Sequence, residues 1–182
     1  MLDIAVNVRM PEIGTTSARE ANEAAARGIS NLVIRHLRER NGRTAPNRHG
    51  LPKSNYYAEA AESITTEVSE AEAVVQIRQP GVGLHWKGGE VRPRPGKKAL
   101  AIPVDARVAT IWPSEAQGSS GGSEYALIWP KGSDHGWIKD AESGDLLWLL
   151  VPHVRIPADS DVLPGIEEMG EAAARAVQEM LS

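Results

Sequence analysis

Apolar side chains recur every three or four positions between residues 17 and 40, which is the spacing of one face of a helix. The positions are Ala21, Ala25, Ile29, Leu32, Val33 and Leu37. Ser17 and Glu20 have the spacing of a capping box at the start of this stretch, and Asn41-Gly42 is a pair that commonly ends helices. The pattern predicts a long amphipathic helix over about residues 17–40.

Other stretches alternate apolar with polar residues, which is the pattern of half-buried strands. Ile64–Val68 and Ala73–Ile77, joined by a short acidic turn, predict a β-hairpin over residues 63–79. Further strands are predicted over 1–8, 99–104, 125–129, 136–139 and 146–156, the last interrupted by Pro152, and further helices over 55–62 and 165–181. This order predicts an α+β fold in which a long N-terminal helix and a C-terminal helix cover an antiparallel sheet.

A chain of 182 residues suits one domain, predicted here over residues 1–182, with a flexible Gly/Ser-rich loop at about 114–123. The absence of cysteine excludes disulfides, thiolate metal sites and cysteine nucleophiles. No apolar run is long enough to cross a membrane, and no signal peptide is visible. We therefore expect a protein without a membrane partner.

Charge is segregated along the chain although the net charge is only −4. Residues 27–53 hold seven basic side chains against one acid, and residues 78–107 hold seven against two. Residues 159–182 instead hold six acids against one base. Blocks of this size are often ordinary solvated surface, but opposite charge at two ends of a subunit also suits head-to-tail packing in a ring.

No set of residues is arranged for catalysis. The five histidines have no metal-ligand spacing. Asp134-His135 could be an acid–base pair, but sequence neighbours point apart in a strand, and here we expect them in a turn flanked by glycine and assign them no catalytic role. Gly81-Val82-Gly83 and Gly88-Gly89 lack the Lys-Ser/Thr of a phosphate-binding loop, and we expect them to form turns with no helix after them. The sequence predicts a protein that is not an enzyme and that has no metal or cofactor.

Five basic residues lie close together beside an aromatic residue, in the segment Trp86, Lys87, Arg92, Arg94, Lys97 and Lys98. Such a segment can contact nucleic acid through phosphate neutralisation, or it can be a solvated loop whose prolines protect a sheet edge. Of the five tryptophans, Trp86 and Trp112 are the two that we expect at a subunit interface, and the others are expected in the core.

The segment from His85 to Pro103 resembles the central part of the phage virion-morphogenesis, or tail-completion (head–tail joining), proteins. The matching positions are His85, Gly88, Gly89, Val91, Pro93, Lys98, Ala99, Leu100, Ile102 and Pro103. Asn55-Tyr56-Tyr57-Ala58 and Ile156-Pro157-Ala158 resemble further blocks of that family. The chain departs from it at Asp159–Leu163, where the relatives often continue with Arg-Pro-Phe-Leu.

The resemblance implies a tail-terminator-like or neck-protein-like α+β subunit of a phage or prophage. It implies self-association into a ring, with six copies as the expected number, at the head–tail junction of the virion. The other partners would be phage neck or tail proteins, with assembly in the bacterial cytoplasm and no cofactor or catalytic residue. We expect the segment Trp86–Lys98 to face a neighbouring subunit or the central channel, where the acidic C-terminal helix of the neighbour can meet it. The alternative is a small, non-enzymatic nucleic-acid-binding module that uses the basic loop 87–98.

Overall fold

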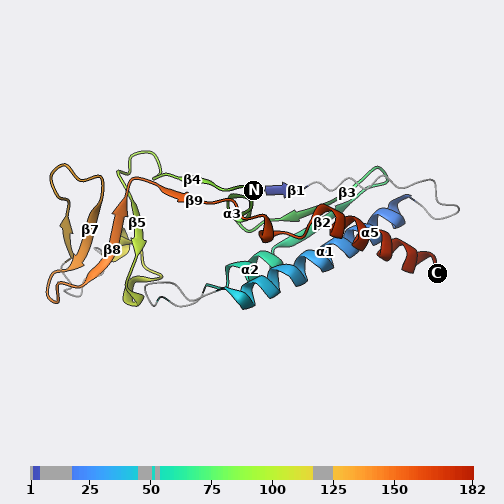
Figure 1. The fold of residues 1–182 in the computed structure, drawn as a ribbon, viewed down its shortest axis with the longest axis horizontal. Coiled ribbons are helices and arrows are strands. Elements are labelled where there is room, and N and C mark those ends of the chain that lie inside the picture. The colour runs from blue at the N-terminus through green and yellow to red at the C-terminus, as the bar shows by residue number, and fades with distance from the viewer. Residues whose placement is uncertain (1, 5–17, 45–50, 52–53, 117–124) are drawn as a thin grey trace. The chain divides into compact units, whose positions relative to one another are not determined.

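The computed structural model describes residues 2–4, 18–44, 51, 54–116 and 125–182 (Figure 1). The chain divides into two compact units. Unit 1 contains Met1–Thr44, Asn55–Gly88 and Pro157–Ser182, and unit 2 contains Ala45–Ser54 and Gly89–Ile156. The single domain over residues 1–182 stays a prediction, because two compact units can still unfold together as one cooperative domain.

In unit 1, helix α1 (Ala18–Arg43) lies along the hairpin formed by β2 (Ile64–Val68) and β3 (Ala73–Ile77). β1 (Leu2–Ile4) pairs with the other side of β3, so that the antiparallel sheet has the order β1-β3-β2. The predicted N-terminal helix and hairpin are confirmed. Residues 1 and 5–8 of the predicted first strand, and Ser17 of the predicted capping box, lie outside the described residues.

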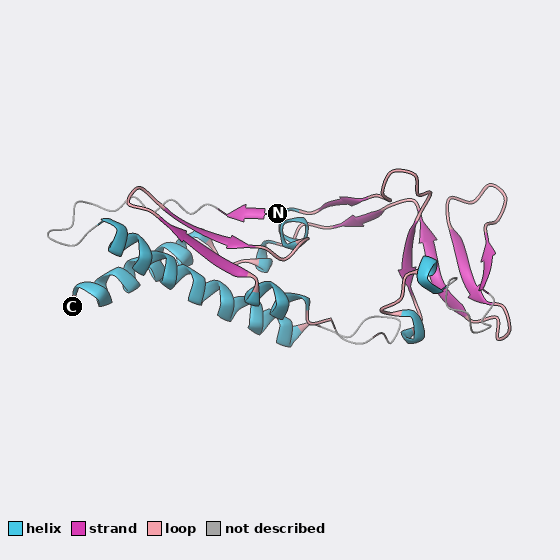
Figure 2. Ribbon diagram, turned by 180° about the vertical axis from the view of Figure 1, so that it is seen from behind, coloured by secondary structure: helices cyan, strands magenta, loops and turns pink. Residues whose placement is uncertain are grey.

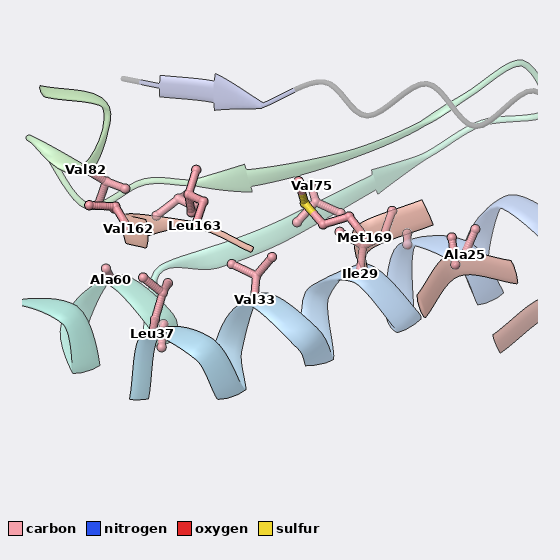
Figure 3. Packing of buried hydrophobic residues seen from close by; sticks show 14 of the residues in the cluster. Ala25, Ile29, Val33, Leu37, Ala60, Val75, Val82, Val162, Leu163 and Met169 are labelled. Atoms are coloured by element: carbon pink, nitrogen blue, oxygen red, sulfur yellow. The ribbon is translucent and has the colours of Figure 1, made fainter. Parts of the chain in front are cut away.

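Helix α5 (Ile166–Leu181) packs along α1, which confirms the predicted C-terminal helix. Ile29 and Val33 of α1 and Met169 of α5 are buried in one core with Val75 of β3 (Figure 3). The two helices approach closely at Gly28, where an added Cβ would lie 2.4 Å from the carbonyl oxygen of Ala172. The lack of a side chain at Gly28 therefore sets the distance between the helices.

Two short helices and one 3-10 turn close one end of unit 1. They are α2 (Tyr56–Glu62), which the sequence predicted, α3 (Val82–Lys87) and η2 (Ser160–Val162). The prediction that no helix follows Gly81-Val82-Gly83 was wrong. Gly81 takes φ +90°, its carbonyl accepts from the backbone N–H of His85 at 3.0 Å, and the Val82 side chain is buried in the unit 1 core. The burial of Val82 thus favours a helix in a segment whose glycines indicated turns.

Unit 2 is built on an open antiparallel sheet with the order β5-β8-β7-β6 (Figure 2). The strands are β5 (Leu100–Pro103), β6 (Tyr125–Ile128), β7 (Gly136–Asp140) and β8 (Leu146–Val151). β4 (Gly89–Val91) pairs separately with β9 (Val154–Ile156), and Pro152 lies where the chain leaves one sheet for the other. The α+β class with antiparallel strands is confirmed, and the strands of the described residues form three sheets.

The core of unit 2 is small and lies on one face of this sheet. It consists of the buried residues Val108, Ile138, Leu147, Trp148 and Leu150. Val108 comes from the 3-10 turn η1 (Ala106–Val108), which is followed by the short helix α4 (Pro113–Ala116). Residues 114–116 of the predicted flexible loop lie in or at the end of α4, and 117–123 lie outside the described residues.

Candidate assembly surface

The segment Arg92–Lys98, called here the basic turn, joins β4 to β5 in unit 2. The backbone N–H of Lys97 donates to the carbonyl of Arg94 at 3.0 Å, so that Pro95 and Gly96 occupy the centre of a β-turn. Gly96 takes φ +83°, which a type II turn requires at this position, and proline suits the position before it. The sequence thus builds a stiff turn whose four cationic side chains are exposed.

The ion pairs around the basic turn leave most of its charge uncompensated. Arg92 Nε lies 2.6 Å from Glu90 Oε1, and Glu90 faces Arg155 across the β4–β9 ladder. Within the part of the chain that the structure describes, Arg94, Lys97 and Lys98 have no ion-pair partner. The turn is therefore a cationic surface with a fixed backbone.

The predicted contact segment is divided between the two units. Trp86 and Lys87 lie on α3 in unit 1, whereas Arg92, Arg94, Lys97 and Lys98 belong to unit 2. The Trp86 side chain is half-buried against the unit 1 core, and Lys87 Nζ lies 5.4 Å from the centre of its ring. Trp86 therefore packs partly within its own unit.

Large apolar side chains are exposed on unit 2. They are Ile111, Trp112, Leu127, Ile128, Trp129 and Leu146, with Trp112 65% and Leu127 64% exposed. Leu127 and Ile128 belong to β6, which is an edge strand of the four-stranded sheet. Exposure of Trp112 agrees with the position expected for it, whereas the core position expected for Trp129 was wrong, since 42% of that residue is exposed. Trp148 is buried in the core as predicted.

The second face of the unit 2 sheet carries a shallow hollow of about 430 Å³. Trp137 of β7 lies opposite Leu149 of β8, and together with Val151 and Pro152 these half-buried side chains form its floor. Asp134, His135 and His153 line its rim and are exposed. We call this feature the Trp137 hollow. The sequence contained a signal for it, because Leu146–Val151 is apolar at every position and so requires cover on both faces.

Asp134 and His135 of the rim, with Ser133 beside them in the sequence, form a Ser-His-Asp set that is not arranged for nucleophilic catalysis. Asp134 Oδ1 lies 2.8 Å from His135 Nδ1, and this contact holds the pKa of Asp134 below its ordinary value. The turn expected for these neighbours is confirmed, since both lie before β7, and in this turn their side chains are in contact. Ser133 Oγ lies 3.2 Å from the same Nδ1 atom. A catalytic triad needs the serine and the aspartate on opposite ring nitrogens, and this set does not provide that.

A second polar cluster joins four elements of unit 1. Arg40 of α1 forms an ion pair with Asp159 and lies over the ring of Tyr57, with 4.9 Å from its guanidinium carbon to the ring centre. Tyr57 Oη lies 3.4 Å from His85 Nδ1, and the backbone N–H of Asp159 donates to the carbonyls of His85 and Trp86. Burial and the Arg40 charge lower the pKa of His85, although Asp159 opposes this. The cluster fixes α1, α2, α3 and the segment before η2 to one another.

Among the residues that the structure describes, no three His, Asp or Glu side chains are placed to hold a metal ion. No helix in those same residues is long and apolar enough to cross a membrane. The surface features of the described residues are the basic turn, the exposed apolar side chains and the Trp137 hollow. Comparisons with family models, curated proteins and solved structures found no match to this chain.

Proposed function

We propose that this protein is a structural subunit of a phage or prophage virion that completes the tail at the head–tail junction by forming a ring. The ordered matches between His85 and Pro103 support the phage assignment. The partners are further copies of the chain, with six as the expected number, and other phage neck or tail proteins. No catalytic step, metal or cofactor is part of the proposal.

The concentration of exposed apolar side chains on unit 2 carries the assembly part of this proposal. Complete burial of a residue such as Leu127 contributes about 1.5–3 kcal/mol, whereas an exposed ion pair contributes about 0–1 kcal/mol. Apolar contacts would therefore supply most of the affinity between subunits. The basic turn would mainly select the partner and the orientation, because complementary charge acts chiefly on specificity and on the rate of association.

A ring requires two different surfaces on each copy, since identical surfaces give a closed dimer. The basic turn supplies one cationic surface. One candidate for the second surface is the exposed side of α5, whose acidic side chains are Glu167, Glu168, Glu171 and Glu179, against the single base Arg175. When a contact between unlike surfaces repeats from copy to copy, each copy is rotated relative to the one before it. The copies form a closed ring when a whole number of these rotations makes a full turn.

The test replaces Arg92, Arg94, Lys97 and Lys98 with glutamate in the phage. We expect heads and tails that fail to join, from a subunit whose circular dichroism spectrum is unchanged. Replacing Arg19 and Arg27, which are exposed on α1, with glutamate gives a control of related charge change. Particles that acquire tails normally in the presence of the folded basic-turn variant would exclude this surface.

The exposed cations on a stiff backbone also favour a second function, which is non-specific contact with nucleic acid. The isolated subunit would then bind duplex DNA with an affinity that falls with salt, with a logarithmic slope of roughly −0.9 for each phosphate neutralised. Binding by a monomer, lost on replacing Arg94, Lys97 and Lys98, would support this function. Absence of DNA binding at low salt would exclude it.

A further inference from the structure

The chemistry of the Trp137 hollow suits a proline-containing turn. Its floor is formed by an indole ring and three apolar side chains, and its rim carries one exposed carboxylate at Asp134. Aromatic-lined grooves bind proline segments because the fixed φ of proline leaves little conformational entropy to lose on binding. A carboxylate at the rim adds a preference for a neighbouring arginine.

The basic turn has the complementary chemistry. Pro95 lies at the centre of the β-turn, and Arg92 and Arg94 precede it on either side of Pro93. All of these residues except Pro93 are exposed, and the hydrogen bond from Lys97 to Arg94 already fixes the shape of the turn. The chain therefore carries both a hollow and a rigid segment that matches it in polarity and charge.

Within one copy the basic turn does not fill the hollow, because the residues lining the hollow come from 134–137 and 149–153. We infer that the Trp137 hollow of one copy binds the Pro95 end of the basic turn of a second copy, with Asp134 facing Arg92 or Arg94. This inference rests on the proposed function and names the surfaces that meet between neighbouring subunits. The contact joins unlike surfaces, so it can repeat around a ring.

The hollow is a better receiving surface for the basic turn than the acidic side of α5. The exposed side of α5 offers carboxylates, and exposed ion pairs alone contribute little affinity. The hollow adds apolar side chains that are half-buried and that a bound turn would cover further. Reversing the charge on the Trp137 hollow and reversing it on α5 should affect self-association differently, so experiments can tell which of the two surfaces binds the basic turn.

The first experiment compares full-length variants by sedimentation velocity over a range of concentrations. The turn variant is Arg92→Glu with Arg94→Glu, the hollow variant is Asp134→Arg, and the helix variant is Glu167→Lys with Glu171→Lys. We expect the turn and hollow variants each to weaken self-association by about tenfold or more, as for a loss at an interface hot spot. The helix variant should associate like the native chain.

Two combinations then test whether the surfaces meet. The chain that carries the turn and hollow changes together should regain association, because the charges are exchanged between the two sides. A mixture of the turn variant and the hollow variant should also associate, because the native turn can meet the native hollow in one contact and the glutamate turn can meet the arginine hollow in the next. Unchanged association of the hollow variant, or no recovery in the combined variant, would overturn the inference.

A synthetic peptide of residues 88–98 separates failure of this inference from failure of the proposed ring. At millimolar concentration the peptide should shift the NMR signals of Trp137 and His135 in the native chain, and a peptide with Pro95→Ala and Arg94→Glu should not. If the native chain associates only into pairs or open chains that do not close into a ring, and the peptide shifts these signals, the ring is wrong and the pairing of surfaces stands. If the chain assembles and the peptide leaves Trp137 unchanged, the ring stands and the inference is wrong.

Discussion

Unit 1 and unit 2 differ in how completely each covers its own apolar residues. In unit 1 the only large apolar side chains left exposed among the described residues are Ile166 and Leu181, at the two ends of α5. In the described part of unit 2, six large apolar side chains are exposed and the buried core contains five residues. The difference indicates that unit 1 covers its apolar residues by its own packing, whereas unit 2 leaves apolar side chains uncovered, as interaction sites often do.

The sources of the difference are visible in the layers of each unit. In unit 1 the hairpin β2–β3 has α1 against it, and α5 lies against α1 (Figure 3). In unit 2 one face of the four-stranded sheet carries the small core around Trp148, and the other face carries the Trp137 hollow. Contacts within a unit favour folding of the isolated chain, and uncovered faces favour association.

The largest expected effect is on unit 1, at the crossing of α1 and α5. A valine at Gly28 would place its Cβ 2.4 Å from the Ala172 carbonyl oxygen and 2.8 Å from Ala176 Cβ, so we expect Gly28→Val to destabilise the fold by about 3 kcal/mol or more. Urea denaturation measures this. The control is Gly170→Ala in α5, where no atom lies within 4 Å of an added Cβ, and it should stabilise by up to about 1 kcal/mol. Equal effects at both positions would contradict the close crossing.

The next effect is confined to unit 2, at the edge of its sheet. A Cβ on Gly136 of β7 would lie 2.5 Å from Trp129 Cε3, so we expect Gly136→Ala to destabilise the β6–β7 pair by about 1–3 kcal/mol. Hydrogen exchange should then rise in β6 and β7 while α1 and α5 keep their protection. The loss should be smaller when Trp129→Ala is also present, because the two residues are in contact. An equal rise in both units would instead support the prediction of one cooperative domain over residues 1–182.

The elements of unit 1 were largely predictable from sequence, because α1, α5 and the hairpin carry their periodicity locally. Helix α3 was not predictable in this way. Its six residues are too few to establish a helical period, and Val82 is buried among residues that are distant in the sequence. The basic turn was recognised as a stiff cationic loop from its prolines. The Trp137 hollow was not recognised. The apolar run Leu146–Val151 indicates that both faces of its strand need cover, but the position of the hollow depends on the pairing of Trp137 with Leu149, and a pairing register cannot be read from either strand alone.

The comparison also predicts opposite consequences for two exposed apolar residues. Leu127→Gln in unit 2 and Ile166→Gln in unit 1 should each change the free energy of unfolding by no more than about 0.5 kcal/mol, because both side chains are mainly exposed. Only Leu127→Gln should weaken self-association in sedimentation experiments. Loss of association with Ile166→Gln, with Leu127→Gln unaffected, would place the assembly surface on unit 1.

The smallest expected effect concerns pH and again separates the two units. Burial and the charge of Arg40 lower the pKa of His85 in unit 1 below its ordinary value of 6.5. As the pH falls below 6.5, the unfolded chain therefore binds a proton at this histidine before the folded chain does. The free energy of unfolding should decrease with falling pH until the lowered pKa of the folded state is passed. Above pH 6.5 the contribution of His85 to stability should be complete.

This loss of stability is measured from urea midpoints at pH 7.5 and at lower pH values, with unfolding of unit 1 read out by hydrogen exchange of the α1 amides. The variant His85→Asn removes the titrating group and keeps a polar atom near Tyr57, so part of the acid-side loss should disappear. His135→Asn in unit 2 should leave the loss in α1 unchanged, since His135 belongs to the rim of the Trp137 hollow. If His85→Asn preserves the full loss, the remaining carboxylates and histidines account for it, and the cluster of Arg40, Tyr57 and Asp159 does not act through His85.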